Sequence, residues 1–179
     1  MSLKYRQTRV RQVTRRRSRA GNALIESVFT ILPTFALICA FADFGLVIFR
    51  WTTLQNAVRE GCRYAVTFQR IGGSGQDTSI KTIVEQYAFG MVRRTDNPQH
   101  IFVNYYSPTN LNTPIASGGN TPGNVVEVSI QNVSWSWLAP LSGSLQWGSA
   151  VRTSGPLSLA VYSSDVLGAY PAGVTSVTR

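Results

Sequence analysis

Groups that carry enzyme chemistry are scarce in this sequence. Its 179 residues include one histidine, two cysteines and eight Asp or Glu residues. A Ser-His-Asp or Cys-His arrangement would have to use His100, which lies at the entrance to a predicted strand. The carboxylates are scattered, with no close pair and no ligand-like spacing. We therefore expect no enzyme activity, no catalytic residue, no metal site and no cofactor.

Two further motifs are missing. The glycine-rich residues 72–75 are not followed by Gly-Lys-Ser or Gly-Lys-Thr, so they indicate a flexible break and not a phosphate-binding loop. Cys39 and Cys62 are 23 residues apart, about 34 Å along a continuous helix, whereas a disulfide needs Cα atoms within about 7 Å. The two cysteines are therefore not expected to bridge within one chain.

Acidic residues are absent from the first 21 positions, where eight of the 17 Lys and Arg residues lie. The rest of the chain holds nine basic and eight acidic residues, so the formal charge of +9 belongs almost entirely to this segment. A basic segment of this kind is typical either of phosphate binding on nucleic acid or of the cytoplasmic flank of a membrane helix. The residues that follow decide between the two.

A long apolar run follows the basic segment. Residues 28–49, VFTILPTFALICAFADFGLVIF, are 22 positions with Asp43 as the one charge. At about 1.5 Å per residue, a helix of this length crosses a hydrocarbon core of about 30 Å. The basic segment holds its own end in the cytoplasm, so the remainder is expected outside it. Nucleic acid is accordingly not an expected partner.

Two kinds of processing place the cut within the apolar run. A lipoprotein needs a small residue before the lipidated cysteine, and Ile38 before Cys39 argues against it. A secretory signal peptide needs an A-x-A-like site, which Ala40 and Ala42 supply before Asp43. The secretory alternative stays open, although the chain continues without the polar break expected near such a cut.

A third kind of processing cuts before the apolar run, as in prepilins. Residues 19–26, RAGNALIE, resemble a prepilin site with cleavage between Gly21 and Asn22. Gly21 suits a protease pocket that takes the backbone close to its catalytic groups, because it has no side chain. Cleavage there would expose a new ammonium on Asn22 and leave a glutamate, Glu26, as the fifth residue of the mature chain.

Glu26 places a carboxylate at the membrane end of an otherwise apolar helix, which costs several kcal/mol unless the charge is paired. We expect Glu26 to pair with the Asn22 amine of an adjacent subunit and to help set axial register during assembly. The alternative is a Glu26 solvated at the level of the lipid headgroups.

An amphipathic pattern continues beyond the apolar run. Apolar or small residues recur at spacings of three and four, which predicts one packing face on a helix. Residues 24–68 are therefore expected to form one helix of roughly 45 residues and about 67 Å, kinked at Pro33. The face packs either on this protein's own domain or on a partner helix. It consists of Trp51, Leu54, Val58, Gly61, Cys62 and Ala65.

Two charges are expected at the outer membrane interface. Asp43 lies 17 residues beyond Glu26, about 25 Å along a helix, so these carboxylates mark opposite ends of the span and form no acid/base pair. Arg50 follows seven residues later on nearly the same face. Asp43 either snorkels toward water there or pairs with a cation on a partner helix.

The remainder predicts a small α+β domain. Residues 79–92 show apolar positions at helical spacing, which predicts a short amphipathic helix. Residues 101–106, 125–133 and 157–162 are rich in β-branched and aromatic residues, and residues 134–137 alternate polar residues with tryptophan. Such short strands are expected to form a small, antiparallel sheet packed on the outer part of the long helix.

Three motifs resemble those of a known family. They are GNALIESVFTILP at residues 21–33, the acid-Phe-Gly at residues 43–45, and TLQNAVREGCRYAV at residues 53–66. All three are similar to segments of the TadE-like minor pilins, or pseudopilins, of tight-adherence (Flp-type) pilus systems. Asp43 stands where that family is expected to have a glutamate, and it keeps the charge. The resemblance covers roughly residues 20–68.

The resemblance implies a pilin-like subunit that is cut by a prepilin peptidase and needed to assemble a pilus used in surface attachment. Other pilin and minor pilin subunits, the pilus assembly machinery and inner-membrane lipid would be its partners. It would span the bacterial inner membrane once, with its N-terminus cytoplasmic, or be incorporated in an extracellular pilus. The alternative is a secreted or single-span anchored domain, cut by an ordinary signal peptidase near Ala42 and not assembled into a pilus. The expected parts are a cleaved basic leader (1–21), a transmembrane and assembly helix (22–50), its amphipathic extension (51–69) and an extracytoplasmic α+β domain (70–179).

Overall fold

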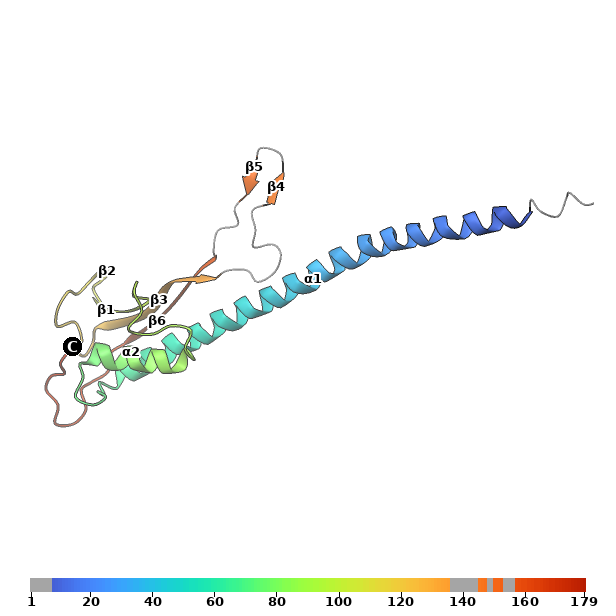
Figure 1. Ribbon diagram of the computed structural model, residues 1–179. Helices are drawn as coiled ribbons and strands as arrows, with labels where there is room; N and C mark the ends of the chain where they lie inside the picture. Colours follow the sequence, from blue (N-terminus) through green and yellow to red (C-terminus); the bar gives the residue numbers. More distant parts are fainter. Residues whose placement is uncertain (1–7, 136–144, 148–149, 153–156) are drawn as a thin grey trace, which may run out of the picture.

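The structure has a long helix, a short helix and a small antiparallel sheet, so the predicted α+β fold is confirmed (Figure 1). The computed structural model describes the backbone of residues 8–135, 145–147, 150–152 and 157–179, and the side chains of residues 23–135 and 157–179. The helices are α1 (Thr8–Val66) and α2 (Gln76–Tyr87). The strands are β1 (Ile101–Ser107), β2 (Asn110–Pro114), β3 (Val125–Trp135), β4 (Leu145–Trp147), β5 (Ala150–Arg152) and β6 (Leu157–Val166).

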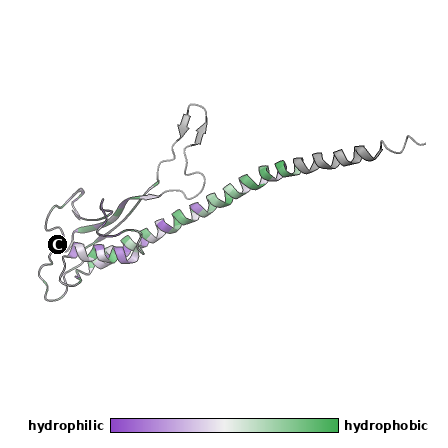
Figure 2. Cartoon of the chain, viewed as in Figure 1, coloured by the Kyte–Doolittle hydropathy of each residue, from purple (hydrophilic) through white to green (hydrophobic). Residues whose placement is uncertain are grey.

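α1 is a continuous helix of 59 residues, about 88 Å long at 1.5 Å per residue. It begins at Thr8 and not at Leu24 as expected, so the boundary of the predicted leader is no break in secondary structure. Pro33 lies inside α1 without ending it, although its missing N–H removes one helical hydrogen bond. Figure 2 shows apolar residues concentrated where α1 projects from the domain, and polar residues where it meets the domain.

α1 ends at Val66 because the chain changes conformation directly afterwards. Phe68 has a φ of 54°, in the left-handed region that non-glycine residues seldom adopt. Its N–H donates to the Ala65 carbonyl at 3.2 Å, and its ring is 4% exposed. The ring packs on Tyr170 with 4.6 Å between centroids. Burial of this large side chain offsets the cost of the backbone conformation.

α2 begins three residues earlier than the expected Ser79 and ends at Tyr87, not at Val92. Apolar periodicity missed this start because Gln76 is polar, although its side chain is fully buried and hydrogen-bonded. Gln76 Nε2 donates to the Ala65 carbonyl at 2.9 Å, which is one of the last four carbonyls of α1 and has no partner within the helix. Gln76 Oε1 accepts from Asn120 Nδ2 at 3.0 Å. The start of α2 is thereby joined to the end of α1.

The main sheet has the strand order β2-β1-β3-β6, and every neighbouring pair is antiparallel. α1 packs on β3 and β6, and α2 packs on β1, so both helices cover the same face (Figure 1). Alternate residues of the three longer strands point toward the helices and are buried, as the pleat requires. These residues are Ile101, Val103 and Tyr105 of β1, Val126, Val128 and Ile130 of β3, and Leu159 and Val161 of β6.

Three of the predicted strands are present as β1, β3 and β6, whereas β2, β4 and β5 were not predicted. β2 is exposed at every position, and its sequence NLNTP has none of the alternation that marks a half-buried strand. It forms because the backbone of β1 offers a free edge directly after a tight turn. Residues 134 and 135 continue β3, while positions 136 and 137 of the predicted 134–137 segment lie outside the described residues.

A polar cluster joins α2 to the sheet and to the C-terminal segment. Asp77 in the first turn of α2 accepts a hydrogen bond from Tyr105 Oη at 2.7 Å and pairs with Arg179 Nε at 2.8 Å. The Arg179 guanidinium also lies 4.9 Å from the centre of the Tyr105 ring. Burial, and then the Asp77 charge, raise the pKa of Tyr105, so the phenol stays a neutral donor.

Candidate functional site

The inner part of α1 carries apolar side chains that the rest of the chain leaves uncovered. Every described position from 23 to 35 is exposed, and ten large apolar residues between 24 and 41 are at least 58% exposed. Leaving such a side chain in water costs roughly 1.5–3 kcal/mol, so together they outweigh the ~5–15 kcal/mol that holds a domain folded. This surface therefore needs lipid or other helices around it. The ten are Leu24, Ile25, Val28, Phe29, Ile31, Leu32, Phe35, Leu37, Ile38 and Phe41.

The length of this surface matches a bilayer. Residues 23–66 contain a stretch long and apolar enough to cross a membrane. Residues 23–42 are 20 positions, about 30 Å of helix, which is the thickness of a hydrocarbon core. From Asp43 onward the chain begins to cover one side of the helix, because Asp43 is 3% exposed and Val47 is 8% exposed.

The polar side chains within the apolar stretch are satisfied inside the helix. Ser27, Thr30 and Thr34 each donate their hydroxyl to the carbonyl four residues earlier, at 2.7, 3.1 and 2.7 Å. Hydroxyls bonded in this way need no water, so they are compatible with a lipid environment. Glu26 then remains as the one ionisable residue between positions 23 and 42 other than Cys39.

Glu26 is exposed near the inner end of the apolar stretch. No described residue of this chain pairs with its carboxylate. Gly21 and Asn22 lie in α1 by their backbone, but side chains before residue 23 are outside the described set. The cleavage site and the pairing of Glu26 with an Asn22 amine therefore stay predictions.

The expected packing face contacts α2 and the sheet. Leu54, Val58 and Ala65 are fully buried, and Cys62 is 2% exposed. Trp51 differs, because its indole is 46% exposed. It lies at the margin of the buried face, where a side chain of its size reaches past the domain. Val47, Ala57 and Phe68 are buried in the same cluster, although the sequence pattern had not singled them out.

Gly61 lies where α1, α2 and β3 meet. A Cβ atom at this position would lie 2.5 Å from Val84 Cγ2 and 3.4 Å from Val128 Cγ1. Real atoms do not approach so closely, and neither valine has room to move because both are fully buried. Glycine is therefore required for the close approach of α2 to α1, which holds the domain against the long helix.

The two charges expected at the outer interface are placed differently from each other. Asp43 is buried within the chain, and its place at the outer membrane interface stays a prediction. Arg50 is half-buried, and its guanidinium lies 5.6 Å from the centre of the Trp135 ring.

Both cysteines are free. The Cys62 thiol donates to the Ser163 carbonyl of β6 at 3.0 Å, which joins the packing face to the edge of the sheet. Burial is the main cause that raises the pKa of Cys62, so the thiol stays protonated and unreactive at neutral pH. Cys39 is half-buried on the apolar stretch.

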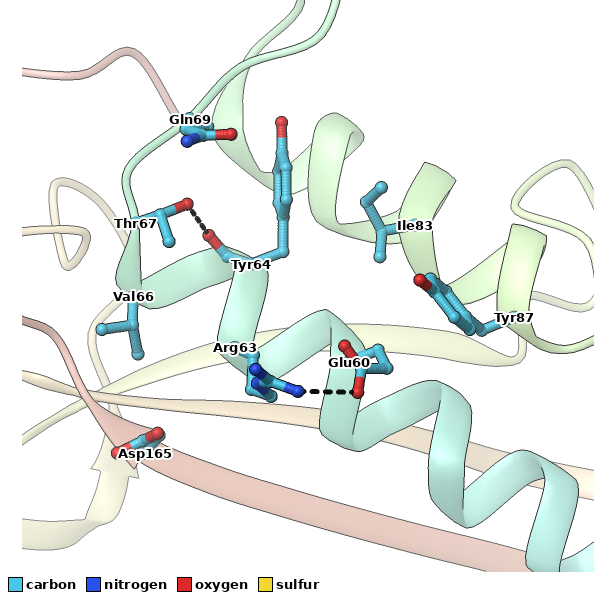
Figure 3. A pocket seen from close by; sticks show the side chains of 9 residues that line it. All are labelled: Glu60, Arg63, Tyr64, Val66, Thr67, Gln69, Ile83, Tyr87 and Asp165. Atoms are coloured by element: carbon cyan, nitrogen blue, oxygen red, sulfur yellow. Dashed lines mark hydrogen bonds and ion pairs between the residues drawn. The ribbon is translucent and has the colours of Figure 1, made fainter.

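A groove of about 470 Å³ lies beside the outer end of α1, between α2 and β6 (Figure 3). Glu60 and Arg63 from α1 line it and pair with each other at 3.1 Å. Arg63 is 75% exposed, so water screens this pair and its contribution to stability is small. Tyr64 and Tyr87 supply aromatic walls, and Asp165 of β6 lies opposite Arg63. Two of the charged residues that follow the apolar run, Glu60 and Arg63, therefore line this groove.

Comparison with protein-family models matches residues 21–63 to the family described as TadE-like protein. The match confirms the resemblance over about a quarter of the chain, from the predicted cleavage site to the charged turn at Arg63. No curated protein and no solved structure matches this chain significantly.

Proposed function

The chain carries a TadE-like segment at residues 21–63, and from this premise we propose that it is a minor pilin, or pseudopilin, of a tight-adherence pilus. In this proposal it is a structural and assembly subunit of a fibre used in surface attachment. α1 anchors it in the bacterial inner membrane, with the N-terminus cytoplasmic and the α+β domain outside. Its partners are inner-membrane lipid, other pilin and minor pilin subunits, a prepilin peptidase and the pilus assembly machinery.

The uncovered apolar surface of α1 is the observation that carries this proposal. It surrounds the helix at positions 23–35 and so offers no preferred side to lipid. Lipid tails are as apolar as leucine, so such a helix packs on neighbouring helices at little cost when it leaves the bilayer. The close packing at Gly61 keeps the domain attached to α1 during that transfer. In a helical fibre of these subunits, the packing of each α1 would then determine the position of the domain attached to it.

Glu26 supplies the specificity that apolar packing lacks. An exposed carboxylate on this surface is costly in lipid and is relieved by a cation at the same depth. The new ammonium on Asn22 lies four residues, about 6 Å, nearer the inner end of the same helix. An adjacent subunit shifted along the fibre axis would bring its Asn22 amine to Glu26. This pairing would set the axial register between subunits.

Two matched variants distinguish the minor-pilin proposal from the secretory alternative. Gly21→Lys should block cleavage and leave a longer chain in the membrane, because a prepilin peptidase pocket excludes a long side chain there. Ala42→Leu should leave processing unchanged, whereas it would block an ordinary signal peptidase, which needs a small residue before the cut. Immunoblotting of envelope fractions reads both, and cells in which Gly21→Lys replaces the wild type should lose surface attachment.

The reverse pattern contradicts the minor-pilin proposal. If Ala42→Leu accumulates a precursor while Gly21→Lys matures normally, the chain is cut at the outer side of the membrane and loses α1 from its mature form. A secreted domain would then be the better description.

A further inference from the structure

A second pocket lies where the apolar run of α1 ends. It has a volume of about 420 Å³ and is formed by three separate parts of the chain. Among the described residues, α1 contributes Leu46, Phe49 and Arg50, the segment after α2 contributes Phe89 and Met91, and the end of β3 contributes Trp135. None of the functions considered above uses this pocket.

Two hydrogen-bond donors in this pocket lack an acceptor. Arg50 Nε and Trp135 Nε1 are both shielded from solvent, and neither bonds to any described residue. Arg50 also forms no ion pair with the described part of the chain. A buried donor without an acceptor is costly, and more so when the donor belongs to a cation that has no anion beside it. The pocket therefore calls for a ligand with anionic oxygen atoms.

The rim of the pocket is apolar and uncovered. Phe89 is 77% exposed and Phe49 is 61% exposed. Phe89 follows the C-cap of α2 with a φ of 50°, at a position where glycine is the usual residue. An exposed phenylalanine in this conformation gains nothing from its own domain. Both rings instead extend the apolar surface of α1 around the entrance.

The position of the pocket along α1 indicates which ligand fits both the hydrogen-bond donors and the apolar rim. The apolar run continues past residue 42 to Phe49, and with residues 28–49 across the hydrocarbon core Arg50 lies at the level of the lipid headgroups. Arginine and tryptophan are the side chains that suit this level, because each has an apolar body and a polar tip. A phospholipid presents a phosphodiester with two free oxygens at this depth and acyl chains just below it.

We propose that this pocket binds the phosphodiester headgroup of a phospholipid from the leaflet on the domain's side of the membrane. Arg50 Nε and the Trp135 indole N–H each donate to a phosphate oxygen, while Phe49 and Phe89 lie along the acyl chains. This inference rests on the membrane placement in the proposed function, and it adds a defined lipid site at the junction of α1 with the domain. A carboxylate of another subunit meets the donors but not the apolar rim, so it is the less favoured occupant.

Native mass spectrometry of the full chain in dodecyl maltoside tests this site by titration with phosphatidylglycerol. Wild type should retain one phosphatidylglycerol, and Arg50→Gln should weaken its apparent affinity at least about tenfold through loss of the charged donor. Trp135→Phe keeps the aromatic ring and removes the N–H, so a loss of about threefold is expected. Arg59→Gln is the matched control, because Arg59 is an exposed cation of α1 outside the pocket, and it should bind as wild type does.

Three results overturn the lipid site. They are equal retention by wild type and Arg50→Gln, equal retention of a neutral glycolipid with the same acyl chains, and dimers whose formation requires Arg50, which would assign the pocket to another subunit. Flotation with phosphatidylglycerol vesicles distinguishes failure of the lipid site from failure of the proposed membrane placement. A chain that floats but retains no phospholipid contradicts the lipid site alone, whereas a chain that does not float contradicts the membrane placement as well. Absence of the wild-type chain from pili, with lipid retention intact, would contradict the minor-pilin proposal and leave the lipid site standing.

Discussion

A chain carrying Glu26→Gln is expected to reach the membrane and be cut normally, but to enter pili at least about tenfold less than wild type. The substitution keeps the size of the side chain and removes the charge that would attract the Asn22 amine of the next subunit. Each lost contact of 1.4 kcal/mol lowers an association constant about tenfold, and an ammonium left unpaired in lipid costs more than that. Immunoblotting of sheared pili against whole membranes gives the ratio directly.

Thr30→Val is the matched control for Glu26→Gln. Thr30 lies one turn further along the same exposed surface, and its hydroxyl bonds only to the Glu26 carbonyl within the helix. Replacing it should change pilus incorporation by less than about twofold, since this internal bond contributes little. Normal incorporation of Glu26→Gln, with normal expression and processing, would remove the register role of Glu26 and leave it as a solvated charge.

Gly61→Val is expected to destabilise the domain by about 1–3 kcal/mol through overpacking. The added side chain would have to displace Val84 or Val128, both fully buried, at the junction of α1, α2 and β3. Thermal unfolding of the purified full chain in detergent, followed by near-UV circular dichroism, should show a lower Tm. The same variant should also bind dyes that report exposed apolar surface, because α2 is separated from α1.

Gly45→Val supplies the comparison for Gly61→Val. A Cβ atom at Gly45 meets nothing within 4 Å in the chain, so its effect on domain unfolding should stay within about 0.5 kcal/mol. Equal stability of the Gly61 and Gly45 variants would mean that α2 does not pack on α1 as closely as described, and that the domain can move relative to the membrane helix.

Periodicity was sufficient to predict the long helix, most of its buried face and the three longer strands. Leu54, Val58 and Ala65 are buried because spacings of three and four place them on one side of any α-helix. The same rule could not place Trp51, because it says which side a residue faces and not how far the domain extends over that side. The end of α1 was equally hard to predict, since Phe68 just beyond it has a positive φ and packs on Tyr170, about a hundred residues later.

Polar residues account for most of what the sequence could not predict. Asp43 was expected at a membrane surface and is buried, and Gln76, which directly follows the predicted break at residues 72–75, starts α2. Gln76 depends on a partner far along the chain, because Asn120 donates to its side chain. The pocket at Arg50 was hidden for the same reason, because Trp135 lies 85 residues away. Glu26, by contrast, could be singled out early, because a lone carboxylate in an apolar run is visible without a structure.

Labelling of single cysteines in intact cells and spheroplasts tests the membrane placement of residues 23–42 most directly. In a background with Cys39 and Cys62 replaced by alanine, Phe35→Cys and Leu111→Cys provide two positions with 61% and 59% exposure in the chain itself. A spanning α1 should protect position 35 from an impermeant maleimide, so that position 111 labels at least about tenfold faster until detergent is added. Equal labelling of the two positions before detergent would show that the apolar part of α1 is in water, contrary to the placement proposed for it.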